Sequence, residues 1–409
     1  MSHAPPPRKP SEPLRALSRS ANKLLGRLTP SRIPPQRTQP GDLQVLLALP
    51  GWSVMRSTDR DYVYERLPQL NAAFRVRFHG NFGFRSLVLA NTQYTIERVA
   101  PMIGVPFTFH GRLPGLKVDP RIEVIFSYGQ YPTGLTTKVP ILWEQTFAPQ
   151  RGVDVRAWIA LQRQEHMRAA TGATRVVTAT HVSAQWFCRI FPEHAHKINV
   201  VPYYLPHLSP ASVTVANKKA HEDQHVRVAF IGKEARRKGL ETLAEAWPLL
   251  SPEARSSLQV TVVSAMLDGR VSLPPEWTHH DFVSDVTEVL RNAHVLAFPT
   301  QREAYGLVLV EGMAAGCAII TAAAPVQQCI VGDEAGIFVD PTSPTEVAGA
   351  LAKLLQDRAL LGRKMTAASE RFRERYAPEV VGLQYTKLLY ASAGRSALDD
   401  ALRRVAISQ

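Results

Sequence analysis

Short apolar runs that alternate with helical stretches constrain the fold of this chain more than any other feature of its sequence. The first series of runs lies at residues 45–49, 87–90, 124–126, 140–143, 175–179 and 199–202, with helical patterning at 155–171 and 181–191. Brief apolar runs bounded by turn residues are typical of strands that are buried on both faces. Their alternation with helices predicts an α/β fold in which helices cover both sides of a parallel sheet.

A second series repeats this pattern after a polar stretch at residues 209–223. Its predicted strands are 226–231, 260–264, 295–298, 318–321 and 337–339, and its predicted helices are 239–250, 286–292, 306–315 and 344–356. A chain of 409 residues is long enough for two such domains. We therefore predict two Rossmann-like, doubly wound domains facing across a cleft, at residues 42–208 and 224–377. Residues 209–223 would link them, and helices in 378–409 would pack back toward the first domain.

The basic charge of the chain is concentrated in its first 41 residues. The net charge is +13, and residues 1–41 contribute eight Lys or Arg side chains, one acidic side chain and nine of the 31 prolines. A segment of this composition cannot bury a core of its own, so we predict an arm that is disordered or amphipathic. Apolar side chains in residues 14–28 recur on one helical face with basic side chains beside it, a pattern typical of a helix on an anionic membrane surface. A solvated tail and an organelle transit peptide stay open as alternatives. Nucleic-acid binding is disfavoured because no aromatic residues interleave the charges.

Cysteine usage and hydropathy indicate the compartment. Cys188, Cys317 and Cys329 form no C-x-x-C pattern, which favours a reducing environment. No apolar run approaches the ~18 residues that a membrane-spanning helix needs. We expect a cytoplasmic protein, either soluble or peripheral on the inner face of the membrane. The sequence 279–281 (His-His-Asp) lacks the spacing of metal ligands, so we expect no metal or other cofactor.

The strongest chemical signal is a glutamate inside an apolar helix. From residue 305 to 320 the only charged side chain is Glu311, and a carboxylate in a helix predicted to be buried is costly unless a partner satisfies it. Two neighbouring sugar hydroxyls are one such partner, because an ionised carboxylate can accept hydrogen bonds from both. The alternative is that Glu311 pairs with a basic side chain.

A second glutamate, Glu303, lies eight residues earlier, where a loop meets the start of this predicted helix. The free backbone N–H groups at the helix start offer a site for an anion, and they belong to Gly306, Leu307 and Val308. The alternative is that Glu303 merely complements the helix dipole.

A basic loop follows the first strand of the second series. Strand 226–231 leads to Gly232 and then to four basic residues, among them Lys233 and Lys238, before a helix begins near Gly239. Lysine side chains suit a diphosphate, and the helix terminus adds a favourable dipole. Alone, such a loop is more often a solvated turn. Because it and the Glu303 loop follow strands of one parallel sheet, we predict that one binds phosphates and the other a sugar.

These segments resemble the retaining glycosyltransferases of family 4, glycosyl transferases of group 1 with the GT-B fold. The resemblance rests on the 233–239 loop, the two glutamates with seven residues between them, the sequence 312–316 (Gly-Met-Ala-Ala-Gly) and the closing stretch 375–390. It is specific across 226–390 and weaker before that. It implies transfer of a hexose-type sugar from a nucleotide-sugar donor to a glycan or glycolipid acceptor, with retention at the anomeric carbon and without a metal ion.

The resemblance also implies roles for individual residues. Lys233 and Lys238 would hold the donor diphosphate, Glu303 would act as a catalytic residue on the hydroxyls of the transferred sugar, and Glu311 would bind the ribose. Donor binding would further involve Gly232, Tyr305, Gly306, Leu307 and Val308.

Three departures from the family pattern concern the rest of the site. The sequence 50–52 (Pro-Gly-Trp) stands where the family has two glycines, and Ala324-Pro325 with Gln327-Gln328 replaces a later glycine pair and glutamate. Glu144 stands near the position at which the family usually has a histidine, and we predict that Glu144 is the second catalytic residue. These departures keep a second reading open, a catalytically degenerate protein that binds a sugar nucleotide or scaffolds an assembly.

Overall fold

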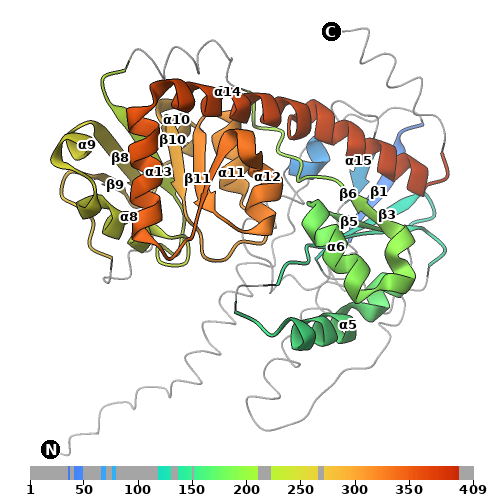
Figure 1. The fold of residues 1–409 in the computed structure, drawn as a ribbon. Helices are drawn as coiled ribbons and strands as arrows, with labels where there is room; N and C mark the ends of the chain where they lie inside the picture. The colour runs from blue at the N-terminus through green and yellow to red at the C-terminus, as the bar shows by residue number, and fades with distance from the viewer. Residues whose placement is uncertain are drawn as a thin grey trace, which may run out of the picture. The chain divides into compact units, whose positions relative to one another are not determined.

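The structure, a computed structural model drawn as a ribbon in Figure 1, is described as two compact units, residues 1–139 and 140–409. It describes residues 36, 41–48, 66–70, 76–79, 118–129, 137–149, 152–210, 223–265 and 271–395. Its strands form two parallel sheets of six strands each. The predicted α/β class with two parallel sheets is therefore confirmed.

In its described residues the first unit has three strands, with β1 in the centre. β1 (Leu43–Ala48) pairs in parallel with β2 (Val76–His79) and with β3 (Val124–Tyr128), and a 3₁₀ turn spans Leu67–Gln69. The predicted strands 45–49 and 124–126 correspond to β1 and β3, whereas 87–90 lies outside the described residues. β2 was not predicted, because the polar residues Arg77 and His79 leave it without the continuous apolar run that marks the predicted strands. The ring of His79 shares a 2.7 Å hydrogen bond with the Gln44 side chain on β1, which satisfies one of these polar groups.

The second unit begins with three parallel strands, β4 (Ile141–Glu144), β5 (Arg175–Thr178) and β6 (Ile198–Val200). Between them lie α5 (Val155–Gly172), α6 (His181–Ile190) and a 3₁₀ turn (Pro192–Lys197). Helix α5 begins where Asp154 accepts hydrogen bonds from two backbone N–H groups, and α6 begins at Thr180 in the same way. Such caps satisfy N–H groups that have no partner inside the helix. The strands and helices predicted here are confirmed.

The sheet of the C-terminal half has the strand order β12-β11-β10-β7-β8-β9. Its strands are β7 (Val226–Ile231), β8 (Leu258–Val263), β9 (Thr278–His280), β10 (Val295–Phe298), β11 (Ala318–Ala322) and β12 (Gly336–Val339). Its helices are α8 (Leu240–Ala246), α9 (Pro252–Ser256), α10 (Val286–Asn292), α11 (Leu307–Ala314), α12 (Pro325–Ala335), α13 (Pro344–Gln356), α14 (Arg358–Arg375) and α15 (Pro378–Ser392), with a 3₁₀ turn at Trp247–Leu249. All five predicted strands are present, and β9 is an additional polar strand at the edge.

The winding of this sheet changes direction between β7 and β10. From β7 the chain proceeds outward through β8 to β9, and from β10 it proceeds the other way through β11 to β12. β10 and β11 are buried at every position, as expected of strands with helices on both faces. In open parallel sheets, ligands bind beyond the carboxyl ends of the strands where the order reverses. The loops after β7 and β10 therefore occupy the position at which a ligand is expected.

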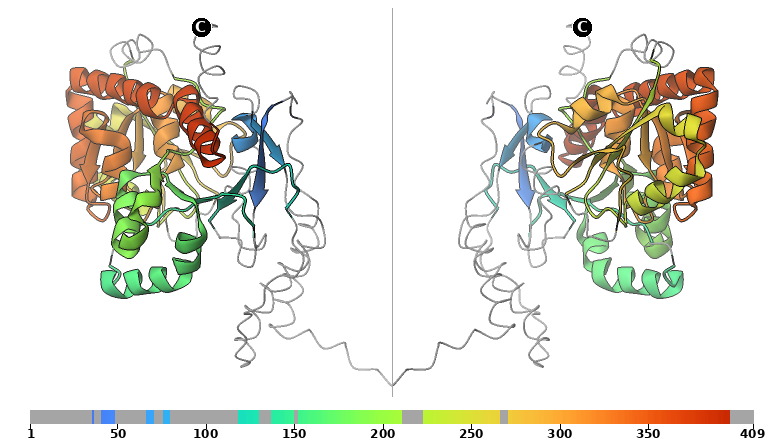
Figure 2. Two further views of the ribbon diagram at one scale, coloured as in Figure 1. Left: turned by 90° about the vertical axis from the view of Figure 1, so that its right-hand side faces the viewer. Right: turned by 90° about the vertical axis from the view of Figure 1, so that its left-hand side faces the viewer.

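The last two helices run one after the other along the same side of the second unit, drawn in red (Figures 1 and 2). α14 contacts α11, α12 and β11, and α15 contacts β4. Of the predicted linker, residues 211–222 lie outside the described part of the chain, as do residues 396–409. The predicted domain boundaries stay predictions.

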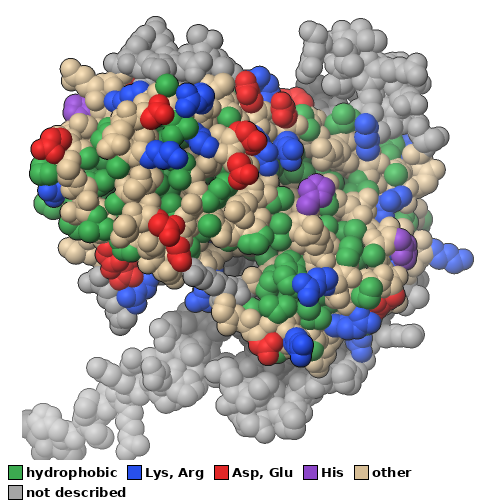
Figure 3. Space-filling model, viewed as in Figure 1, with side chains coloured by type: hydrophobic (Ala, Val, Ile, Leu, Met, Phe, Trp, Pro, Cys, Tyr) green, Lys and Arg blue, Asp and Glu red, His purple; other side chains and the backbone are tan. Residues whose placement is uncertain are grey.

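The surface of the described residues carries both signs of charge. On the face seen in Figure 3, acidic and basic side chains are interspersed. Within the described ranges no helix is both long and apolar enough to cross a membrane. The arm at residues 1–41, with its predicted membrane-binding stretch 14–28, lies outside the described residues except for Gln36 and Gly41.

Candidate functional site

The loop between β7 and α8 is a tight turn that needs glycine at both ends. Gly239 has a φ of 86°, and a Cβ atom there would overlap the carbonyl oxygen of Pro299 in the loop after β10. At Gly232 a Cβ atom would lie 3.1 Å from Cγ of Lys238, so the missing side chain leaves room for the stem of that lysine. The glycines thus bring the two loops together and allow Lys238 to extend between them.

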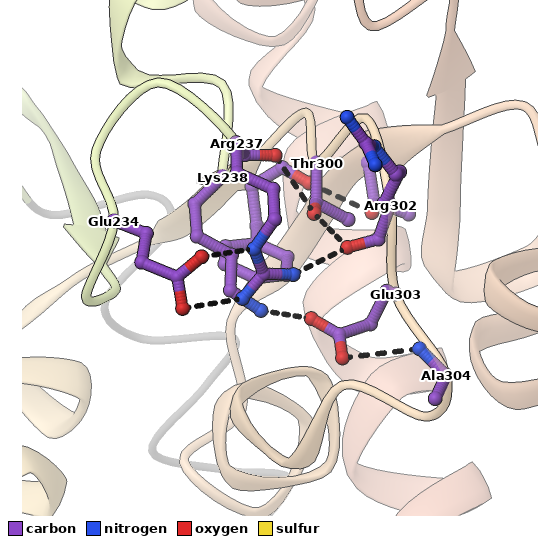
Figure 4. Close-up of polar contacts among 9 residues, drawn as sticks. Glu234, Arg237, Lys238, Thr300, Arg302, Glu303 and Ala304 are labelled. Atoms are coloured by element: carbon purple, nitrogen blue, oxygen red, sulfur yellow. Dashed lines mark hydrogen bonds and ion pairs between the residues drawn. The ribbon is translucent and has the colours of Figure 1, made fainter. Parts of the chain in front are cut away.

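Hydrogen bonds join the two loops (Figure 4). The backbone N–H of Gln301 donates to the carbonyl oxygen of Arg237 at 3.0 Å, and the Thr300 hydroxyl lies 3.3 Å from the same oxygen. In return, the Arg237 guanidinium donates to the carbonyl oxygen of Arg302 at 2.7 Å and to the carboxylate of Glu234 at 2.6 Å. Sequence reasoning counted Arg237 among the basic residues of the loop but gave it no role. The structure shows that it fixes the two loops to each other.

Lys238 and Glu303 form an ion pair at the centre of this junction. The Lys238 ammonium donates to Oε2 of Glu303, each side chain is 14% exposed, and the other Glu303 oxygen accepts from the Ala304 N–H at 3.2 Å. The ammonium also lies 5.1 Å from the centroid of the Phe298 ring. Burial lowers the pKa of Lys238, and the neighbouring carboxylate opposes that shift. The structure therefore brings together the predicted phosphate-binding and sugar-binding side chains, 65 residues apart in the chain.

Lys233 differs from Lys238 in its surroundings. It lies on the same loop, its side chain is exposed, and it has neither a hydrogen bond nor an ion pair with any residue in the described ranges. It is therefore available to an anionic ligand at the open side of the loop.

The first turn of α11 begins beside Glu303. Its N-cap is Gly306, with a φ of 90° and no side-chain cap, and Leu307 and Val308 are half-buried. A Cβ atom at Gly306 would lie 3.2 Å from Cγ of Glu303, so glycine permits the close approach of the carboxylate stem. No side chain caps the helix, so its first N–H groups can receive an anion, and the predicted anion site stays a prediction.

Glu311 is less buried than its apolar neighbours led us to predict. The buried positions of α11 are Leu309, Val310, Gly312, Met313 and Ala314, whereas Glu311 is half-buried. The free-energy cost of removing the Glu311 carboxylate from water is therefore smaller than for a fully buried carboxylate. The predicted burial of Glu311 was wrong, because an unbroken apolar run does not show which face of the helix reaches the surface.

Tyr305 points inward. Its side chain is 3% exposed, burial raises the pKa of its hydroxyl well above the ordinary value, and its ring lies against the ring of Tyr203 at 4.6 Å between centroids. Tyr203 follows β6 and was not singled out from the sequence, where nothing but its aromatic side chain marked it.

Glu144 lies at the end of β4 and is fully buried. Its Oε1 atom accepts a 2.9 Å hydrogen bond from the Tyr385 hydroxyl on α15, whereas Oε2 has no partner within the described residues. Burial raises the pKa of Glu144 to about 8, and the Tyr385 hydrogen bond partly opposes the shift. Over the described ranges it shares no hydrogen bond or ion pair with Glu303, so these two predicted catalytic residues are not joined directly.

The described residues contain no group of three or more His, Cys, Asp or Glu side chains placed to hold a metal ion. In the stretch 279–281, the ring of His279 instead bonds the Ser264 carbonyl oxygen at 3.1 Å.

Comparisons with known proteins find similar sequences for the part of the chain that carries both loops. Residues 225–357, which include both loops, match the family model of glycosyl transferases group 1. D-inositol 3-phosphate glycosyltransferase of Corynebacterium kroppenstedtii is 32% identical over 163 residues, 39% of this chain and 32% of that protein. The enzyme of the same name from an Arthrobacter species is 26% identical over 226 residues, 50% of this chain and 52% of that one. The chain thus spans about a third to a half of the length of these curated relatives.

Solved structures are similar to this chain in fold. Anabaena HepE in complex with UDP-glucose matches with a TM-score of 0.57 and 13% identity, over 85% of this chain and 99% of that one. Sucrose-phosphate synthase of Thermosynechococcus elongatus matches with a TM-score of 0.53 and 16% identity, over 85% and 98%. At these identities the likeness shows the fold. Residues 225–357 are therefore similar to the glycosyl transferases group 1, and the chain has the GT-B fold.

Proposed function

We propose that this protein is a retaining glycosyltransferase that moves a hexose-type sugar from a nucleotide-sugar donor to a glycan or glycolipid acceptor. The observation that carries the proposal is the Lys238–Glu303 ion pair at the reversal point of the sheet, beside the uncapped start of α11. The match of the same residues to glycosyl transferases group 1 supports it, as does the UDP-glucose bound by HepE. Membership of family 4 stays a prediction.

Donor binding would exchange one set of partners for another. The diphosphate would draw the Lys238 ammonium away from Glu303 and also engage Lys233 and the first N–H groups of α11. Glu303, released from the lysine, would accept hydrogen bonds from two hydroxyls of the sugar, and Glu311 would accept from those of the ribose. The donor thus gives Lys238 and Glu303 each a new partner, so neither charged side chain is left buried without one.

The proposed chemistry is a substitution at the anomeric carbon. The bond from this carbon to the diphosphate oxygen breaks, the acceptor hydroxyl oxygen bonds on the same face and passes its proton to the departing diphosphate oxygen, and the nucleoside diphosphate leaves. Lys238, Lys233 and the α11 terminus would stabilise the negative charge that develops on the departing diphosphate. Because these groups supply positive charge, we expect turnover to persist when divalent ions are chelated.

Titration with UDP, followed by a UDP-release assay with UDP-glucose and a panel of glycan and glycolipid acceptors, tests the proposal. Lys238→Met should weaken UDP binding by about tenfold or more, as expected for one charge-assisted contact. Lys353→Met, at an exposed lysine on α13, is the matched control and should bind UDP like the unmodified chain. Equal UDP affinity in both variants would place the phosphate site elsewhere.

One observation favours a second candidate function, a sugar-nucleotide-binding protein without transferase activity. Glu144, the predicted catalytic group of the N-terminal half, is fully buried and engaged by Tyr385. If UDP-glucose binds with affinity that depends on Lys238, yet no acceptor elicits UDP release, the second candidate is the correct one.

A further inference from the structure

The loop that carries Glu303 is held from both sides. On its N-terminal side, Thr300, Gln301 and Arg302 bond to Arg237 in the neighbouring loop. On its C-terminal side, the next large side chain is Tyr305, which is 3% exposed. The position of the Glu303 carboxylate therefore depends on what holds Tyr305.

Tyr305 is held by a residue from the N-terminal half of the chain. The ring of Tyr203 meets the ring of Tyr305 at 4.6 Å between centroids, with an interplanar angle of 63°. Edge-to-face contacts of this kind fix the relative orientation of two rings as well as burying them. Tyr203 lies three residues after the end of β6, and the adjacent Tyr204 and Leu205 are buried.

A second contact fixes Tyr203 itself. Its hydroxyl shares a 3.0 Å hydrogen bond with the hydroxyl of Thr146, two residues beyond the end of β4. The next residue, Phe147, is 1% exposed and its ring lies 6.0 Å from that of Trp143 and 5.8 Å from that of Phe187. Thr146 is thus attached to a packed aromatic cluster, which makes it a firm anchor.

We propose that Tyr203 is a positioning residue, which sets the Glu303 loop relative to the ends of β4 and β6 through its contacts with Thr146 and Tyr305. The proposal rests on the function proposed above. β4 and β6 belong to the segment predicted to bind the acceptor, whereas Glu303 faces the donor sugar. Through Tyr203, the alignment of the donor sugar with the acceptor depends on the Thr146 hydroxyl. UDP binding relies on Lys233, on Lys238 and on the start of α11, and it does not depend on the Thr146 hydroxyl.

Removal of single hydroxyl groups tests this inference. Tyr203→Phe keeps the ring contact and Thr146→Val keeps the shape of that side chain, and each variant deletes the shared hydrogen bond. Each should lower kcat for transfer about five- to tenfold, the range expected for one hydrogen bond, and leave UDP affinity within about twofold. The double variant should lose no more than either single variant, because both changes remove the same bond. Tyr204→Phe, at the adjacent buried tyrosine, is the control and should retain kcat.

Hydrogen exchange provides a readout that does not need turnover. In Tyr203→Phe, the backbone N–H groups of residues 303–305 should exchange faster than in Tyr204→Phe, because the loop before α11 is less firmly held. Equal exchange in the two variants, or additive losses of kcat in the double variant, would overturn the inference. Absence of both UDP binding and transfer in the unmodified chain would contradict the proposed function instead, and exchange would then decide the positioning role alone.

Discussion

Lys238 and Glu303 neutralise each other across two loops that are 65 residues apart in the sequence. Both side chains are largely withdrawn from water, so each needs an opposite charge or a hydrogen-bonding ligand. A nucleotide sugar offers both kinds of partner, an anion for the lysine and hydroxyl groups for the carboxylate. Because of this exchange of partners, we expect removal of the Glu303 carboxylate to change UDP binding and sugar transfer in opposite directions.

Glu303→Gln should tighten UDP binding while suppressing transfer. Without the carboxylate, Lys238 is free for the diphosphate, and we expect UDP affinity to rise about threefold. Transfer from UDP-glucose should fall about a hundredfold, because the sugar loses a charged acceptor in the reacting complex. Calorimetric titration and a UDP-release assay measure the two effects, with Glu288→Gln on α10 as an exposed control. Weaker UDP binding in Glu303→Gln would show that the carboxylate supports the phosphate site instead of competing with it.

Glu144 makes the stability of the protein depend on pH. Burial raises its pKa from 4.5 to about 8, so the folded chain retains a proton that the unfolded chain releases. Stability linked to this group is therefore fully present below about pH 4.5 and is lost as the pH rises toward 8.

Glu144→Gln removes this dependence while keeping an oxygen for the Tyr385 hydroxyl. Relative to the unmodified chain, the variant should gain on the order of 2–4 kcal/mol of unfolding free energy between pH 5 and pH 8.5, since each pKa unit corresponds to about 1.4 kcal/mol. Urea unfolding at the two pH values measures the change, and Glu165→Gln on the exposed face of α5 is the control. An equal stability difference at both pH values would mean that Glu144 ionises normally in the folded protein.

At the scale of elements, the two ligand-facing loops depend on glycine for their close approach. Gly239 and Gly306 both have positive φ, and each caps the helix that follows its loop. Helix starts of this kind lack a side chain that would occupy the N–H groups, which leaves those groups to a ligand.

Gly239→Ala should both destabilise the protein and weaken UDP binding. Its Cβ atom would overlap the Pro299 carbonyl oxygen, and its backbone would be strained at a φ of 86°. We expect a loss of roughly 2 kcal/mol or more of unfolding free energy. Gly349→Ala is the matched control, because a Cβ atom there meets nothing within 4 Å and α13 should gain helix propensity. Equal stabilities of the two variants in urea unfolding would argue against the contact between the loops.

At the scale of the whole molecule, more than half of the net positive charge belongs to residues 1–41. Residues 1–41 carry eight basic side chains and one acidic one, whereas Figure 3 shows both signs interspersed over the face in view. This distribution fits a basic arm attached to an α/β body, and it does not by itself require nucleic acid.

Deletion of residues 1–41 should weaken binding to vesicles containing anionic phosphatidylglycerol by about tenfold or more, because several basic residues each contribute near such a surface. Binding to pure phosphatidylcholine vesicles should change little, and raised salt should reduce the difference. Sedimentation with vesicles measures the effect, and the Tm of the shortened chain reports whether folding is spared. Unchanged binding to the anionic vesicles would favour a solvated tail.

The buried elements were predictable from sequence because strands such as β7 and β10 are continuous apolar runs between turn residues. The polar strands β2 and β9 escaped prediction, since edge strands need no continuous apolar run. Helices α12 and α14 were not predicted from the sequence either. Gly332, with a φ of 72°, interrupts α12, and polar residues make α14 resemble a solvated segment.

The parallel α/β architecture, the basic loop and the two glutamates follow from the amino-acid sequence alone, because burial periodicity and charge are local properties of the chain. The folded structure was needed to establish that Lys238 meets Glu303, that Glu311 is half-buried, and that Glu144 lies buried against Tyr385. It also decided that Tyr203 joins Thr146 to Tyr305. These are contacts between residues far apart in the chain, and they depend on which strand ends the sheet order brings side by side.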